Sequence, residues 1–173
     1  MMRGLAMLLV LLALLGLSAW LADGPMLRAL PEALRLWRMP APETVPVPVQ
    51  GVAARRIADT WGAGRSGGRR HEGTDIFAPR GTPVTSATRG VVVRIADGGL
   101  GGRQVWVLGP GGERHYYAHL DDWAPGLHAY QVVRAGDVLG VVGDTGNARG
   151  TPPHLHYGIY GEGGARNPHP RLR

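Results

Sequence analysis

Two histidines separated by one residue, His154 and His156, are the side chains of this sequence best suited to do chemistry. The residues around them are rich in β-branched and aromatic types, which favours a strand. Alternate side chains of a strand share a face, so both imidazoles are expected on one face and Leu155 on the other. Such a pair can bind a metal ion or transfer protons, but it also occurs by chance and needs partners elsewhere in the chain.

His71 and Asp75 are the first candidate partners. They are not part of a helical His-Glu-x-x-His zinc motif, because the third and fourth residues are glycine and threonine and the fifth is aspartate. In a turn followed by a strand, the two side chains can still converge. With one histidine of the 154–156 pair they offer two nitrogens and one oxygen, which leaves a tetrahedral zinc ion the open position that a hydrolase needs. The alternative is a surface hydrogen bond between His71 and Asp75.

His119 is the second candidate partner. If its segment is a regular strand, His115, Tyr117 and His119 share a face, and one or two of them line a cleft beside the metal. An uncoordinated imidazole in that position can transfer protons or stabilise the oxyanion of a tetrahedral intermediate. His115 is a weaker candidate and His128 a weaker one still, and both are expected to be ordinary surface histidines; His169 is given no role.

The composition limits the chemistry further. The chain has 173 residues, no cysteine and a formal net charge of +6. Thiolate ligands and disulfides are therefore excluded, and any metal must be held by His, Asp or Glu. All 19 basic residues are arginine, which excludes lysine Schiff bases and lipoyl or biotinyl attachment. The positive charge fits attraction to an anionic polymer or a bias in base composition. No basic stripe interleaved with aromatic residues indicates nucleic-acid binding.

The first 22 residues are expected to direct the chain out of the cytoplasm. Residues 4–22 form an uncharged, leucine-dominated run after Arg3, just long enough to cross a bilayer as a helix. Trp20 and Leu21 stand where a cleavage site would need small residues, so an uncleaved signal-anchor is favoured over a cleaved signal peptide. Either alternative exports the rest of the chain to the cell envelope, anchored and facing the periplasm or exterior, or secreted.

A stalk is expected between this segment and the folded domain. Residues 26–37 are typical of a short interfacial helix interrupted at Pro31, or of a loose stalk. Residues 40–48 alternate proline with other types, as a polyproline spacer does. The predicted division is therefore a signal-anchor or signal peptide at 1–22, a stalk and linker at 23–48, and one domain at 49–173.

The domain is predicted to be all-β, a compact antiparallel sandwich or barrel. Glycine and proline together make 42 residues, 28 and 14, which suits short strands joined by tight turns. A possible first strand lies within residues 52–68, and turns at intervals of about ten residues separate the others. These strands are expected near 83–87, 90–96, 103–109, 113–120, 131–134, 138–143 and 154–160.

Several fragments together resemble one known family. They are His71-x-Gly-x-Asp75-Ile, Ala78-Pro79-x-Gly81-Thr82-Pro83-Val84, Gly90-Val91-Val92, Tyr117-Ala118-His119-Leu120, Gly136-Asp137-Val138-Leu139-Gly140-x-Val-Gly143-x-Thr145-Gly146 and His154-Leu-His156-Tyr. Over residues 52–168 this order resembles the lysostaphin/LytM-type zinc metallopeptidases, which are peptidoglycan endopeptidases with a compact antiparallel β fold. Three histidine motifs in the same order make the resemblance specific.

The resemblance implies a role for each candidate residue. His71, Asp75 and His156 would ligate one zinc ion, while His154 would be the general base and His119 would help to stabilise the oxyanion. Peptide cross-links of peptidoglycan would be the substrate, and no oligomeric state follows. The sequence departs from the family only beside the pair, where Tyr157-Gly158 and Pro152-Pro153 occur, and no chemical group is lost.

Two other functions compete with this prediction. A catalytically silent envelope module that binds peptidoglycan or activates another hydrolase would be expected to lack metal ligands, and none is missing here. A carrier domain is indicated by the hairpin at residues 136–146, but the chain has no lysine to carry a lipoyl or biotinyl group.

Overall fold

The computed structural model describes Met7 and residues 24–173. Apart from Met7, the expected signal-anchor at residues 1–22 lies outside the described residues. No helix among the described residues is both long and apolar enough to cross a membrane.

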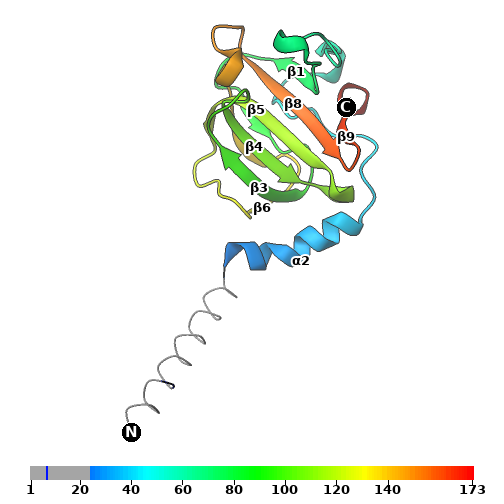
Figure 1. Ribbon diagram of the computed structural model, residues 1–173, viewed down its shortest axis with the longest axis vertical. Helices are drawn as coiled ribbons and strands as arrows, with labels where there is room; N and C mark the ends of the chain where they lie inside the picture. The colour runs from blue at the N-terminus through cyan, green and yellow to red at the C-terminus, as the bar shows by residue number, and fades with distance from the viewer. Residues whose placement is uncertain (1–6, 8–23) are drawn as a thin grey trace.

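The described chain is mostly β-structure, as predicted. Nine antiparallel strands form one sheet in the order β1-β8-β5-β4-β3-β6, with β7 paired to β5, β2 to β7, and β9 to β8 (Figure 1). Their bounds are β1 Thr74–Phe77, β2 Pro83–Thr85, β3 Gly90–Ala96, β4 Arg103–Leu108, β5 Arg114–Trp123, β6 Val132–Val133, β7 Val138–Val142, β8 His154–Gly161 and β9 Gly164–Arg166.

Strand β5 joins the two parts of the sheet. Its first half pairs with β4 and β8, and its last residues pair with β7 instead. Register shifts between Leu120 and Asp122 bend the strand at this change of partner. The sheet therefore folds over a single core, to which almost every strand contributes valine, leucine, isoleucine or tyrosine.

Two segments that precede β1 differ from the predictions. Residues 52–68 hold no strand but two short 3₁₀ helices, Ala54–Arg56 and Ser66–Gly68. Helix α2 runs from Pro25 to Arg38 without interruption at Pro31, so the predicted break is wrong. Pro31 lacks only the N–H that would bond to the carbonyl of Leu27, and both residues lie on the exposed side, where solvent replaces that bond.

Part of the expected proline-rich spacer packs on the domain. Val45 is buried, and its N–H donates to the carbonyl of Arg171 at 2.8 Å while its carbonyl accepts from the N–H of Arg173 at 2.9 Å. The N–H of Thr85 donates to the carbonyl of Pro48 at 3.0 Å. The bonds of Val45 tie the last residues of the chain to the segment after α2, beside which the C-terminus lies in Figure 1, and the bond of Pro48 ties this segment to β2.

The expectation that His115, Tyr117 and His119 share a face is wrong. His115 and Tyr117 are fully buried in the core, whereas His119 lines a cleft on the other side of the sheet with Tyr116 and Ala118. The cause is local, because His119 has a left-handed backbone with φ of 64°, which breaks the alternation of the strand.

His115 is a fully buried structural residue, so the expectation of an ordinary surface histidine is wrong. Its Nδ1 lies 2.7 Å from the hydroxyl oxygen of Tyr157, and its Nε2 has no hydrogen-bond partner among the described residues. Burial lowers the pKa of His115 to about 4; the charge of Glu113 raises it and that of Arg171 lowers it further. The fold therefore favours the neutral imidazole.

Acidification is expected to destabilise the fold through His115. In the unfolded chain its pKa is near 6.5, so the unfolded state binds the proton first as the pH falls. The stabilisation is complete above about pH 6.5 and lost as the pH approaches 4, amounting to roughly 3 kcal/mol. Urea unfolding at pH 7 and at pH 4.5 measures this loss in the free energy of unfolding. In a His115→Asn variant the free energy of unfolding should depend less on pH. An equal pH dependence in both proteins contradicts the assignment.

Candidate metal centre

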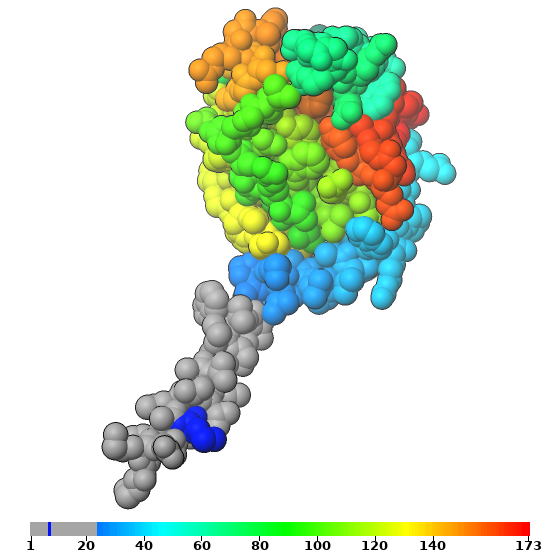
Figure 2. All heavy atoms as spheres, in the orientation of Figure 1, coloured from blue at the N-terminus to red at the C-terminus, as the bar shows by residue number. Residues whose placement is uncertain are grey.

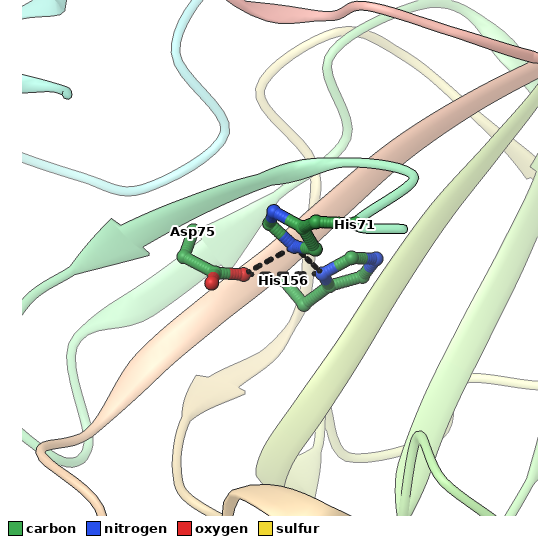
Figure 3. A group of neighbouring side chains, drawn as sticks. All are labelled: His71, Asp75 and His156. Carbon is green, nitrogen blue, oxygen red and sulfur yellow. Dashed lines mark hydrogen bonds and ion pairs between the residues drawn. The ribbon is translucent and has the colours of Figure 1, made fainter. Parts of the chain in front are cut away.

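Three side chains far apart in sequence meet at one point. Nε2 of His71 lies 3.0 Å from Oδ1 of Asp75 and 2.8 Å from Nδ1 of His156, and Nδ1 of His156 lies 3.1 Å from the same carboxylate oxygen. Figure 3 shows the three side chains pointing toward one another, from the loop before β1, from β1 and from β8. One small ion can therefore contact all three.

The sheet and a short loop produce this convergence. Strands β1 and β8 pair so that Asp75 stands directly opposite His156. His71 is brought to them by a loop that closes on itself, since the N–H of Gly62 donates to the carbonyl of His71 and the N–H of His71 to the carbonyl of Ala63, each at 2.9 Å. The hydroxyl of Thr60 accepts from the N–H of Asp75 at 3.0 Å and fixes the start of β1.

The donor atoms fit a zinc ion. Nδ1 of His71 lies 2.7 Å from the carbonyl oxygen of Thr60, which only accepts, so Nδ1 carries the proton and Nε2 of the neutral ring presents a lone pair. That lone pair faces the Asp75 carboxylate oxygen with no proton between them, an arrangement that a cation stabilises. The three separations approach the roughly 3.3 Å between neighbouring nitrogen or oxygen ligands of one tetrahedral zinc ion.

The electrostatics keep these groups in ligating form. Burial alone would raise the pKa of Asp75, but the contacts of its carboxylate with the imidazoles of His156 and His71 outweigh burial and hold the pKa well below its usual range. Burial lowers the pKa of His156, although Asp75 opposes this shift. Nη2 of Arg65 donates to Oδ2 of Asp75 at 2.6 Å, which leaves Oδ1 facing the two histidines.

His154 lies in the same cleft but not in the triangle of donor atoms. Strand β8 puts it on the same face as His156, with Leu155 buried in the core, as the sequence predicts. Its Nδ1 lies 2.8 Å from the carbonyl oxygen of Pro152 and must donate there. The Nε2 of the neutral ring is therefore a proton acceptor.

His119 provides a second uncoordinated imidazole. Its ring centroid lies 5.1 Å from that of His154 and 5.8 Å from that of His156. Nδ1 lies 2.9 Å from the carbonyl oxygen of Thr145, so this ring also carries its proton on Nδ1 when neutral. Burial and the neighbouring histidines lower the pKa of His119 to about 4. Its Nε2 is thus a proton acceptor, and donates only after protonation.

All five residues line one cleft of about 800 Å³. Arg65 and residues 69–72 line one side, residues 147–148 and 151–152 line another, and the aromatic side chains of Trp106, Tyr116 and Tyr160 also line the cleft. In Figure 2 these two segments lie at the end of the domain opposite α2. The cleft can hold an extended polymer segment beside the convergent histidines.

Three supporting residues were not predicted. Thr60 orients both His71 and Asp75, Arg65 holds the second oxygen of Asp75, and the carbonyl of Thr145 fixes the His119 ring. Thr60 and Arg65 belong to a loop that the sequence marks only by its glycines and arginines, and a backbone carbonyl leaves no signal in a sequence. The five predicted residues do gather here, whereas His115 lies in the core, His128 is exposed and His169 is part-buried.

Gly73 lies close enough to His156 to make a specific substitution informative. A Cβ at this position would lie 2.6 Å from Cε1 and 2.7 Å from Nε2 of His156, and 2.7 Å from the carbonyl oxygen of Tyr157. Gly73→Ala is therefore expected to displace the His156 ring and weaken zinc binding about tenfold or more, as misplacing a ligand does. Competition with a chelator measures the zinc affinity of the variant.

Gly163→Ala is the matched control, because a Cβ there meets no atom within 4 Å. Unchanged zinc affinity in Gly73→Ala would mean that His156 does not ligate the metal.

Comparison with known proteins identifies relatives of this chain by sequence. The L-Ala--D-Glu endopeptidase of Bacillus subtilis (strain 168) is 41% identical over 139 residues, which are 74% of this chain and 42% of that protein. Lysostaphin of Staphylococcus simulans is 35% identical over 92 residues, 52% of this chain and 18% of that protein. The chain thus spans less than half the length of these relatives.

Solved structures agree with the fold. The catalytic domain of lysostaphin from Staphylococcus simulans superposes with a TM-score of 0.59 at 29% identity, covering 66% of this chain and 90% of that one. Csd3 of Helicobacter pylori superposes with a TM-score of 0.59 at 30% identity, covering 75% of this chain and 35% of that one. The expected likeness to lysostaphin is confirmed.

The sequence model of one family, described as Peptidase family M23, matches residues 69–168. This range is more than half of the chain and contains every residue of the candidate metal centre and both uncoordinated histidines of the cleft. The chain therefore belongs to peptidase family M23.

Proposed function

We propose that this protein is a zinc endopeptidase that hydrolyses peptide cross-links of bacterial peptidoglycan. The observation that carries the proposal is the triangle of His71, Asp75 and His156 ligand atoms beside two uncoordinated imidazoles in one cleft. Relatives named as an L-Ala--D-Glu endopeptidase and a peptidoglycan DD-endopeptidase support the substrate class.

His71, Asp75 and His156 would hold the metal. When bound, zinc supplies a positive charge that polarises a scissile carbonyl and makes a water molecule more acidic. The three protein ligands leave room for substrate at the open side of the cleft. Thr60 and Arg65 keep the ligands in their orientations through the hydrogen bonds that they make with His71 and Asp75.

His154 would act as the general base. Because its Nδ1 donates to the carbonyl of Pro152, Nε2 accepts the proton of the attacking water. The water oxygen then joins the carbonyl carbon, the C–N bond breaks, and the protonated His154 returns its proton to the leaving amine. His119 would stabilise the oxyanion, and for this it must first take up a proton on Nε2, because its Nδ1 is committed to the carbonyl of Thr145.

The charge of the cleft supports an acidic peptide as substrate. Arg65, Arg69 and Arg70 line one wall, against two acidic residues, of which Asp75 already pairs with Arg65. Among the described residues, Arg69 and Arg70 bond only to a serine and to a backbone carbonyl of their own loop, with no carboxylate partner. Their guanidinium groups can bind substrate carboxylates, such as the glutamate beside the bond cut by the Bacillus subtilis relative.

Arg69→Glu is expected to raise KM several-fold for an acidic stem peptide and to leave kcat unchanged. An exposed ion pair contributes up to about 1 kcal/mol, and charge reversal replaces that attraction by repulsion. The effect should shrink at high salt. Arg134→Glu, at an exposed position outside the cleft, is the matched control. Equal KM values for both variants would exclude this wall from substrate binding.

The domain would act in the cell envelope. Residues 1–22 would anchor the chain in the membrane or be cleaved on export, and residues 49–173 would form the catalytic domain. Residues 24–48, expected as a stalk and linker, would connect the two as a segment that packs on the domain rather than as a free spacer. The uncharged run at 4–22 and the envelope substrate support this division.

Digestion of purified sacculi tests the function. The full-length chain, purified in detergent and loaded with zinc, is expected to release soluble muropeptides, whose masses identify the bond that is cut. A zinc-loaded protein that binds sacculi and releases nothing would instead be a catalytically silent envelope module.

A further inference from the structure

Helix α2 divides its surface into three sectors. With about 100° between successive residues, Ala29, Ala33 and Leu36 fall on one side, and Ala29 and Leu36 pack with Val91 of β3. Glu32, at the edge of this side, pairs with Arg89 at 2.5 Å. These contacts fix how the helix is oriented on the domain.

The second sector is apolar and exposed. Met26, Leu27, Leu30, Leu34 and Trp37 fall within one arc of about 100° on the helix, beside the packed side. Their exposed fractions run from 40% for Leu27 to 58% for Trp37. Scattered apolar residues are common on protein surfaces, but five on one continuous arc mark a contact surface.

The third sector is basic. Arg28, Arg35 and Arg38 are all exposed and lie beyond the other border of the apolar arc, Arg38 about 20° from its edge, Arg35 about 80° and Arg28 about 100°. An amphipathic helix with leucine and tryptophan on one face, bordered by arginine, is typical of helices that lie in the headgroup region of a bilayer. Each arginine near an anionic surface adds about 1 kcal/mol of attraction.

The nearness of α2 to the uncharged run at 4–22 favours a bilayer as the partner of the apolar sector. Only Asp23 and Gly24 separate α2 from the uncharged run at 4–22, and two residues span at most about 7 Å. If that run is in a membrane, α2 begins at the membrane surface. We infer that the apolar sector of α2 lies on an anionic lipid bilayer, with its arginines among the headgroups. This inference rests on the membrane anchoring proposed above.

The orientation of the domain follows. In Figures 1 and 2, α2 lies at one end of the domain, and the segments that wall the cleft lie at the other. Because the apolar arc lies about 100° round the helix from the side that packs on the domain, a bilayer against this arc lies beside α2 and leaves the cleft, at the far end of the domain, open to the polymer outside the membrane. Peptidoglycan strands near the membrane would come within reach of the cleft. A flexible stalk, in contrast, would not fix the distance between the cleft and the membrane.

Nitroxide labels test this arrangement. Because the sequence has no cysteine, a single introduced cysteine is the only thiol that the label can modify. Leu30→Cys and Leu34→Cys are labelled in the full-length chain, reconstituted in vesicles that contain phosphatidylglycerol. Both labels are expected to collide several-fold more with oxygen than with a water-soluble nickel chelate. Arg149→Cys, exposed beside the cleft, is the control, and its label should show the opposite preference.

A label at Leu11→Cys separates the two proposals. If the label at position 11 reports lipid while those at 30 and 34 report water, the inference on α2 fails and the anchoring stands. If all three report water, both fail, and digestion of sacculi still tests the endopeptidase separately. Distance-dependent broadening between labels on two chains would show that a second copy, not lipid, covers the helix, and would also overturn the inference.

Discussion

Replacing His71 by alanine is expected to abolish zinc binding and hydrolysis together. His71 supplies one of the three ligand atoms that converge in the described part of the chain, and its Nε2 is aimed at the other two by the carbonyl of Thr60. Loss of an outer partner of a zinc ligand already costs 10- to 100-fold in affinity, so loss of the ligand should cost more than about 100-fold. Zinc content after dialysis against a weak chelator measures the loss of zinc binding in the variant.

His128→Ala is the matched control for this substitution, because His128 is exposed and bonds only within its own loop. It should keep both zinc and activity. A His71→Ala protein that folds and still retains one zinc per chain would show that the metal is held elsewhere.

His154→Ala is expected to retain zinc and lose turnover. The side chain lies outside the triangle of ligand atoms, so zinc affinity should stay close to that of the unsubstituted protein. Removal of a general base slows the chemical step by about 10²- to 10⁴-fold, and the loss should fall on kcat rather than KM. Zinc content and steady-state kinetics on a soluble muropeptide measure the two effects.

The comparison with His71→Ala decides the roles of the histidine pair. Equal loss of zinc in His71→Ala and His154→Ala would make His154 a ligand and overturn the division of roles between it and His156. A circular dichroism spectrum like that of the unsubstituted protein shows that the change is confined to the site.

Much of the fold follows from turn residues and strand patterns. The strands expected at 90–96 and 154–160 form at almost those bounds, and the two-residue period correctly puts His154 and His156 on the face opposite Leu155. Regular strands obey local rules that a sequence exposes. The pairing that sets Asp75 opposite His156 is a long-range contact that local patterns do not predict. The residues alone suggested one histidine of the pair as a ligand beside His71 and Asp75, and only the resemblance to a family selected His156.

The wrong predictions have local causes. A single left-handed residue, His119, reverses the faces of its strand, and no glycine marks the position in the sequence. The carbonyls that set the protonated nitrogen of three histidines, from Thr60, Thr145 and Pro152, belong to loops whose shape depends on the whole fold. Pro31 stays within a helix because packing on the domain outweighs one missing hydrogen bond.

The most direct test of the metal-dependent endopeptidase is a zinc titration of the full-length protein after removal of metal by a chelator. Release of soluble muropeptides from sacculi is followed as zinc is added. The rate is expected to start near zero, to rise linearly and to level off at one zinc per chain. Undiminished release from the metal-free protein, or no release once one zinc is bound, would contradict the account.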